Sequence, residues 1–196
     1  MRNFRFTALL LVAFSLVSLR SSAQHEVKTN VLGLIFNQFG LTYEYVLDDN
    51  MGIVGSLAYF TPPSSFSYDY QAISFTPEFR YYFNPDEDAD GYFVGGYLKY
   101  RNTTTDEYPG IDTTGFGSFR LVKQTTNGVA LGITTGRKWV TRSGFMFETW
   151  VGFGRYLFVS ETYGDDYEPN DFDNATDDLP AWDIRLGATV GWRFGR

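Results

Sequence analysis

The stretch RLGATVGWRF, residues 185–194, alternates between two kinds of side chain. One phase runs from Leu186 through Val190 to Trp192 and Phe194, and the other holds arginines, glycines and a threonine. Successive side chains of a β-strand point to opposite faces, so this period of two predicts a strand with one apolar and one polar or small face. What each face contacts decides the class of fold.

Eight such runs follow one another after residue 24, and none of this part shows sustained helical periodicity. The predicted strands are 26–35, 39–47, 52–61, 73–84, 92–102, 128–141, 145–160 and 182–194. An even number of similar runs predicts an all-β, antiparallel up-and-down barrel. The connections after strands two, four and six are short, and those at 62–72, 103–127 and 161–181 are longer. Short turns at one end and long loops at the other are typical of outer-membrane barrels, which puts both termini at the periplasmic end. The first connection, FNQ, breaks this trend.

The first 23 residues have the pattern of a secretory signal peptide. A basic start, MRNFR, precedes an apolar run of 13 residues, and SSA offers a small-residue cleavage site. The run is too short to span a bilayer as a helix. We expect export through the Sec pathway, cleavage after Ala23 and a barrel domain over 24–196. The signal peptide contains three of the 16 basic residues and none of the 23 acidic ones, so the mature chain has a net charge of −10. This negative charge argues against a nucleic-acid partner. The absence of cysteine excludes disulfides and thiolate metal sites.

The polar phase of the strands carries charges of both signs, interleaved with glycines. Its members are Glu44, Glu78, Arg80, Lys99, Arg101, Lys138, Glu148, Asp183 and Arg185. A soluble lipocalin-like barrel would turn the apolar phase inward, but eight strands enclose too little space for so many phenylalanines and tyrosines. We therefore expect the apolar phase to face lipid and the charges to pair in a closed lumen. Glu78 is expected to pair with Arg or Lys on neighbouring strands.

Aromatic residues of the apolar phase gather at strand ends on the short-turn side. They are Tyr81, Phe83, Tyr92, Trp139, Phe145, Trp192 and Phe194. Aromatic girdles mark membrane–water interfaces, so this set predicts the periplasmic interface.

Several segments carry a family resemblance: KTNVLG (28–33), LTYEY (41–45), TPEFRYYF (76–83), GRKW (136–139) and GATVGWRF (187–194). They resemble the small eight-stranded outer-membrane barrels of Gram-negative bacteria, of the OmpA-transmembrane and OmpX type, in an uncharacterised branch of that superfamily. The resemblance implies outer-membrane lipids as partners. The closing strand also resembles the signal read by the outer-membrane assembly machinery, with Gly187, Val190, Trp192 and Phe194 in its glycine and hydrophobic positions.

Catalytic chemistry has little support in the sequence, and no cofactor is expected. The single histidine, His25, lies next to the expected mature N-terminus. Lipid-modifying barrel enzymes resemble this chain in size, but they use His and Ser at the outer rim, which is the opposite end. Asp171, Asp173 and Asn174 in the acidic segment 161–181 look faintly like a calcium loop but lack the glycine and glutamate of an EF-hand, so a solvated acidic loop is favoured. The aromatic-rich long loops suit either recognition or extension of the strands, and 118–126 alternates well enough to lengthen strand six.

The favoured function is a non-enzymatic outer-membrane barrel with a closed, charge-paired lumen and outer loops for surface contact or envelope integrity. A lipid-modifying enzyme and a small porin or transport component are the alternatives.

The lipid-facing phase can be tested by placing a charge at different depths. We expect Leu131→Arg, mid-strand in the apolar phase, to cost about 2–4 kcal/mol of folding free energy, and Phe145→Arg, at the interface, only about 0–1 kcal/mol from the lipid. Thr134→Arg points into the lumen and carries a steric cost only. Denaturant titration after folding into lipid vesicles gives the three values. Cooperative folding to a soluble monomer without lipid or detergent would contradict the membrane assignment.

Overall fold

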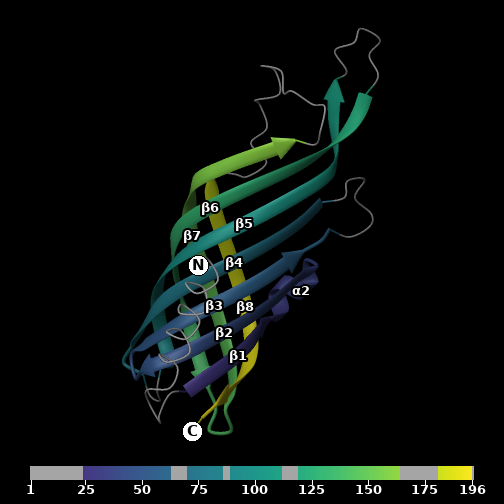
Figure 1. Ribbon diagram of the computed structural model, residues 1–196. Coiled ribbons are helices and arrows are strands. Elements are labelled where there is room, and N and C mark those ends of the chain that lie inside the picture. Colours follow the sequence, from purple (N-terminus) through teal and green to yellow (C-terminus); the bar gives the residue numbers. More distant parts are fainter. Residues whose placement is uncertain (1–23, 63–69, 86–88, 112–118, 164–180, 196) are drawn as a thin grey trace, which may run out of the picture.

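The computed structural model describes residues 24–62, 70–85, 89–111, 119–163 and 181–195. Their eight antiparallel strands close into one barrel, paired in chain order with the last strand hydrogen-bonded to the first (Figure 1). The strands are β1 (Gln24–Asn30), β2 (Gln38–Asp48), β3 (Met51–Phe60), β4 (Tyr70–Phe83), β5 (Gly91–Ile111), β6 (Phe119–Val140), β7 (Phe145–Tyr163) and β8 (Trp182–Phe194). The predicted all-β, up-and-down barrel is confirmed. The expected signal peptide lies outside the described residues, among which no helix is long and apolar enough to cross a membrane.

The barrel is apolar outside and charged inside. Leu131 and Ile133 expose 54% and 64% of their surface, whereas Lys28 exposes 1% and Glu44 none. This arrangement inverts the burial of a soluble domain, in which lysine and glutamate are almost never fully buried. The lipocalin-like alternative, with the apolar phase inward, is therefore wrong.

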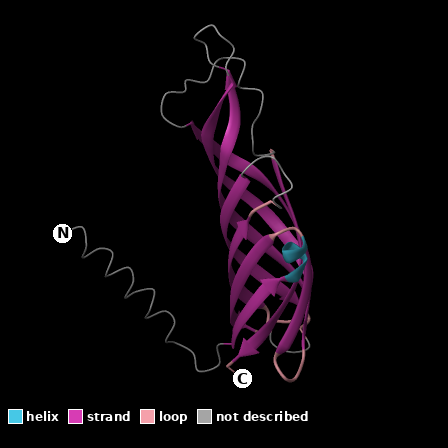
Figure 2. Cartoon of the chain, turned by 90° about the vertical axis from the view of Figure 1, so that its right-hand side faces the viewer, coloured by secondary structure: helices cyan, strands magenta, loops and turns pink. Residues whose placement is uncertain are grey.

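The first strand is shorter than the sequence predicted. The alternation in 26–35 continues past Asn30, but the chain instead forms a short helix, α2 (Val31–Ile35), beside the barrel wall (Figures 1 and 2). The Asn30 side chain accepts a hydrogen bond from the Gly33 backbone N–H at 3.2 Å, as an N-cap residue does. Asn37 then takes a left-handed φ of 55°, which asparagine tolerates better than most residues, and turns the chain into β2.

Four strands are longer than predicted at the end away from the short turns, where β4 begins at Tyr70 instead of 73. β5 continues beyond residue 102 to Ile111, β6 begins at Phe119 instead of 128, and β7 continues to Tyr163. The two longest strands pair as far as Ile111 and Phe119, so their hairpin projects beyond the rest of the barrel (Figure 2). The alternative that 118–126 lengthens strand six is confirmed from Phe119 onward. Backbone pairing with β5 keeps residues 119–127 in strand conformation. The turn residues around this segment hide the strand in the sequence.

The interior at the short-turn end is packed with aromatic and apolar side chains. Tyr82 and Phe93 lie in a fully buried cluster with Val46 and Ala89, and Trp150 packs against it. The register His25↔Phe194 puts the start of β1 and the end of β8 at this same end. The barrel is therefore filled with side chains where its first and last strands meet.

Glycines on the inner face make room for large side chains. A Cβ built on Gly132 would lie 2.5 Å from the Tyr97 ring and 2.6 Å from the Phe153 carbonyl oxygen. A Cβ on Gly154 would lie 2.5 Å from the Tyr97 hydroxyl. Tyr97 on β5 thus crosses the interior toward β6 and β7, where only glycine leaves it space.

This packing predicts that alanine lowers the stability of the barrel at an inner-face glycine but not at an outer-face glycine. Gly132→Ala should destabilise the folded barrel by about 1–3 kcal/mol, because the Phe153 backbone cannot move as freely as a side chain. Gly96→Ala is the matched control on β5, since its Cβ would meet nothing within 4 Å. Denaturant titration in the same vesicles compares them, and equal stability of the two variants would contradict the crowding of the inner face.

Candidate functional site

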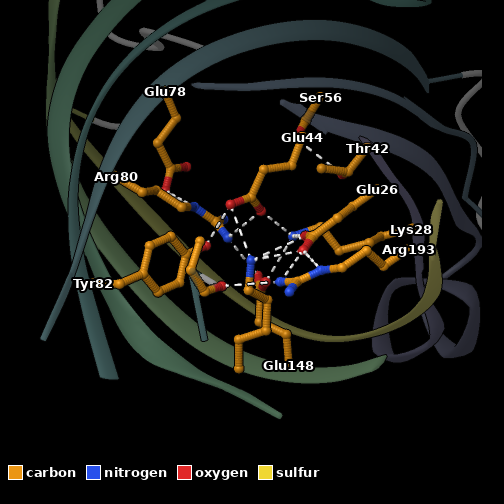
Figure 3. Close-up of polar contacts among 12 residues, drawn as sticks. Glu26, Lys28, Thr42, Glu44, Ser56, Glu78, Arg80, Tyr82, Glu148 and Arg193 are labelled. Atoms are coloured by element: carbon orange, nitrogen blue, oxygen red, sulfur yellow. Dashed lines mark hydrogen bonds and ion pairs between the residues drawn. The ribbon is translucent and has the colours of Figure 1, made fainter. Parts of the chain in front are cut away.

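Eight charged side chains meet inside the barrel, at the level of β1, and we call them the interior network (Figure 3). They are Glu26, Lys28, Glu44, Glu78, Arg80, Lys138, Glu148 and Arg193, all buried. Four are acidic and four are basic, so the set is balanced in charge. Such balance is needed because an unpaired ion in a low-dielectric interior carries a penalty of several kcal/mol.

Two glutamates and two lysines form the centre of the interior network. Glu26 accepts hydrogen bonds from Lys138 at 3.0 and 3.1 Å and from the Arg193 guanidinium at 2.5 and 2.8 Å. Glu44 accepts from Lys28, from Lys138 at 3.1 Å and from the Tyr82 hydroxyl at 2.5 Å. These contacts tie β1 and β2 to β4, β6 and β8 across the interior.

Arg80 links this centre to the far wall. Its Nη1 donates to Glu148 on β7 at 2.9 Å and its Nε to Glu78 on the same strand at 2.6 Å. Lys28 donates to Glu148 as well, at 2.8 Å. Glu148 therefore joins two cations, one from each side of the barrel. The guanidinium of Arg80 also stacks on the Phe93 ring, 4.3 Å from its centroid. The interior network therefore contacts the aromatic cluster at the short-turn end.

A second, smaller group of charges lies in the other half of the interior. Lys99 donates to Asp183 at 2.5 Å, and the Tyr97 hydroxyl donates to the same carboxylate at 2.9 Å. Arg185 lies over the Tyr97 ring, 3.9 Å from its centroid, and reaches Glu78 only at 3.4 Å. Arg101, half-buried, donates to the Tyr70 hydroxyl at 2.8 Å.

Between the interior network and this outer group lies a cavity of about 470 Å³. Glu78, Arg80 and Glu148 form part of its lining, together with Thr42 and Ser56, which hydrogen-bond to each other at 2.9 Å. The charge-paired, closed lumen that the sequence predicts is therefore filled at the short-turn end, whereas its outer half holds this cavity. The strands there carry alanine, serine and threonine inward, which fill less space than the tyrosine and phenylalanine at the short-turn end.

The structure places all nine predicted lumen charges in the interior, in two groups. Glu44, Glu78, Arg80, Lys138 and Glu148 lie in the interior network, and Lys99, Arg101, Asp183 and Arg185 lie in the outer group. The expected partner of Glu78 was wrong: it pairs with Arg80 of its own strand and with Arg185 across the barrel, whereas Lys99 on the adjacent β5 pairs with Asp183.

Three network members were absent from the sequence prediction: Glu26, Lys28 and Arg193. The signal that could have found them is the same period of two, since Glu26 and Lys28 alternate with outward Val27 and Arg193 shares the phase of Arg185. They belong to the two strands that close the ring.

The predicted girdle residues are all exposed and lie at strand ends by the short turns. Trp139 stacks on Phe147, and Phe145 packs edge-on against Trp192. The Arg137 guanidinium lies 4.8 Å from the Tyr92 ring and 5.0 Å from the Trp139 ring. Aromatic side chains with an adjacent cation therefore line this end of the barrel over β4 to β8.

Candidate catalytic and metal residues do not assemble into a site in the described part of the chain. His25 is hydrogen-bonded to the Tyr43 hydroxyl at 2.6 Å on the outer face, at the short-turn end. The described residues contain no cluster of three or more His, Asp or Glu suited to a metal ion. Asp171, Asp173 and Asn174 lie outside those residues, so the calcium hypothesis stays a prediction.

Comparison with known proteins places the chain in a family. A family model described as a protein of unknown function (DUF3575) matches residues 6–179. The chain belongs to this family. A search of curated proteins found no match.

Comparison with solved structures shows which fold this chain has in common with other proteins. A major outer membrane protein from Thermus thermophilus is 14% identical with a TM-score of 0.58, over 88% of this chain and 100% of that one. Neisserial surface protein A (15% identical, TM-score 0.48, 89% and 93% covered) and Ail of Yersinia pestis (13%, 0.39, 88% and 95%) also match. At this identity the Thermus structure shows a shared fold, that of an outer-membrane β-barrel.

The interior network predicts a large effect for removing one carboxylate. Glu44→Gln leaves Lys28 and Lys138 short of a partner in a buried site, which should lower the free energy of unfolding by about 3–5 kcal/mol. Asp49→Asn, in the exposed turn between β2 and β3, is the matched control and should change it by less than about 0.5 kcal/mol. Denaturant titration of both variants in lipid vesicles measures the difference. A Glu44→Gln barrel as stable as the control would show that the network contributes little.

Proposed function

We propose that this DUF3575 chain is a non-enzymatic outer-membrane barrel that is blocked at its periplasmic end and presents its outer half for surface contact or envelope integrity. The observation that carries the proposal is the inverted burial: every strand exposes apolar side chains on the outer face, and the buried charges lie inside. Where neighbouring strands pair, the barrel satisfies its backbone hydrogen bonds within the wall, which the hydrocarbon core of a bilayer requires.

The outer surface supports a membrane position in a particular orientation. The girdle around Trp139 and Trp192 suits the interface at the short-turn end, where Arg137 can reach lipid headgroups. Short periplasmic turns and longer outer connections are the usual arrangement of these barrels. Both ends of the described chain then face the periplasm, consistent with Sec export of a precursor.

The filled interior argues against a pore. Eight strands leave no aqueous channel, and here the interior network and the aromatic cluster occupy the end through which a solute would leave. The balanced charges rigidify the wall instead. A porin therefore has less support than a closed scaffold. A lipid-modifying enzyme also has less support, because the described residues do not bring a nucleophile and a base together at the outer rim.

Two partner classes follow from this proposal. Outer-membrane lipids surround the apolar belt. The assembly machinery recognises the closing strand through Gly187, Val190, Trp192 and Phe194, of which Trp192 and Phe194 are exposed on the outer face. The extended β5–β6 hairpin would carry any contact beyond the membrane.

The orientation and the membrane position can be tested together, because the chain has no cysteine of its own. Ser143→Cys lies in the short turn before β7, and Thr162→Cys lies 17 residues beyond the start of that strand, whereas about 9–11 residues span a bilayer. A membrane-impermeant thiol reagent on intact cells should label Thr162→Cys. It should label Ser143→Cys only after the outer membrane is permeabilised. Labelling of Ser143→Cys but not Thr162→Cys on intact cells would reverse the orientation, and equal labelling of both in the soluble fraction would contradict the proposal.

A further inference from the structure

The wall of the barrel has a gap above the end of β1. β8 pairs with β7 from Phe145↔Trp192 to Arg155↔Trp182, but it pairs with β1 only between Thr189 and Phe194. On the other side, β2 pairs with β1 only from Leu41 onward. In the outer half, no described strand therefore lies between the edges of β8 and β2 that face each other.

The short helix α2 lies in this gap without completing the sheet. The Ala188 N–H, on the open edge of β8, donates to the Asn30 side chain at 3.3 Å. Backbone groups of alternate residues point to the same edge, so those of Ile184 and Leu186 face the gap as well. A bare strand edge is not tolerated against hydrocarbon; it occurs at membrane depth only where it lines a cavity or is covered.

The interior cavity reaches this gap. Its lining includes Leu32 and Phe36 from the α2 segment and Ile184 and Leu186 from the open edge, as well as the interior Arg185. On the outside, Ile35 exposes 75% of its surface and Ile184 exposes 69%, so the gap opens within the apolar belt. One space therefore connects a charged interior with the apolar surface of the barrel.

The inner part of the cavity has hydrogen-bonding capacity that the described residues do not use. Its wall carries four cations, Arg80, Lys99, Arg101 and Arg185, against the three carboxylates of Glu78, Glu148 and Asp183. The Thr189 hydroxyl, in a residue that is 3% exposed, has no hydrogen-bond partner among the described residues, and neither does Nε of Arg185. Buried polar groups are nearly always partnered, so such groups point to a missing acceptor.

We infer that the gap between α2 and β8 is a lateral portal through which a single-chain anionic amphiphile, of the fatty-acid type, enters the cavity from the membrane. Its anionic head lies by Arg185 in the inner part of the cavity, which Thr189 also lines, and its hydrocarbon chain leaves between Leu32, Phe36 and Leu186. The inference rests on the proposed membrane position and deepens it by naming what the outer half of the barrel binds.

Charge and size select this class of ligand. An arginine that stacks on Tyr97 and makes only long contacts, at 3.3 Å to Thr134 and 3.4 Å to Glu78, has donors left for a carboxylate or a similar anion. The cavity volume lies in the lower part of the range of small-molecule pockets, about 300–1,000 Å³, which suits one chain better than a lipid with two. A neutral amphiphile would leave the excess of cations unmatched.

Trp150 provides a reporter, because it lines the cavity and lies 5.1 Å from the Arg185 guanidinium. The other three tryptophans, Trp139, Trp182 and Trp192, are exposed on the outer face. The full chain carrying Phe at those three positions is folded into lipid vesicles and titrated with a brominated fatty acid, whose bromines quench tryptophan fluorescence at short range. We expect saturable quenching of Trp150, and at least tenfold weaker binding of the brominated methyl ester.

Variants separate the site from general partition into lipid. Arg185→Gln removes a charge-assisted contact and should weaken the quenching affinity about 10- to 100-fold. Thr189→Val, which keeps the shape of the side chain, should weaken it less. Arg142→Gln, in the exposed turn before β7, is the matched control and should leave the affinity unchanged. If Arg185→Gln fails to fold, Thr189→Val and the methyl ester still decide the result.

A second reporter distinguishes failure of the portal from failure of the proposed function. In a chain that keeps only Trp192, vesicles of brominated phosphatidylcholine should quench the fluorescence, because that side chain faces lipid. If Trp192 is quenched but the fatty acid leaves Trp150 unchanged, the portal is wrong and the membrane barrel stands. Quenching of Trp150 by two-chain brominated lipid but not by the fatty acid also overturns the single-chain assignment. If Trp192 is not quenched, the membrane position itself is wrong.

Discussion

The pairing of β1 with β8 is the interaction on which the structure depends. It joins the two ends of the sheet over the short seam from His25 to Asn30, and it converts an open sheet with two bare edges into a ring. Closure fixes the inner and outer faces of all eight strands at once. Along the seam the backbone groups of β1 and β8 pair within the wall, as a bilayer requires, and the charged phase is forced into the interior, where each ion needs a partner.

The interior is organised along the barrel axis as a consequence. At the seam, aromatic rings and the interior network fill the space, and Lys28 and Glu148, 120 residues apart in the chain, become direct partners. Above the seam, β1 has already ended and the inward side chains are small. A cavity and a gap in the wall appear at the same level for the same reason: one strand is too short to continue the ring.

This division gives the two halves of the molecule different roles in our proposals. The blocked half accounts for stability and for the absence of a pore, because its charges are balanced and its contacts cross between strands that are distant in sequence. The open half has cations, a threonine hydroxyl without a partner among the described residues, and an apolar exit toward the membrane surface. A barrel that is blocked at the short-turn end and open at the gap between α2 and β8 suits both contact at the cell surface and uptake of an amphiphile from the surrounding lipid.

The sequence by itself determined the number of strands, the antiparallel meander and which phase of each strand carries charge, because alternation is a local property of neighbouring residues. It also placed Glu44, Lys138 and Glu148 on the inner face. It did not determine which charges meet, since Glu78 pairs within its own strand and across the barrel, and such distances exist only after the ring closes. The end of β1 was likewise hidden, because residues 31–35 read equally well as strand until the Asn30 side chain caps a helix turn. The cavity and the lateral gap follow from that early ending, and only the tertiary structure decided them.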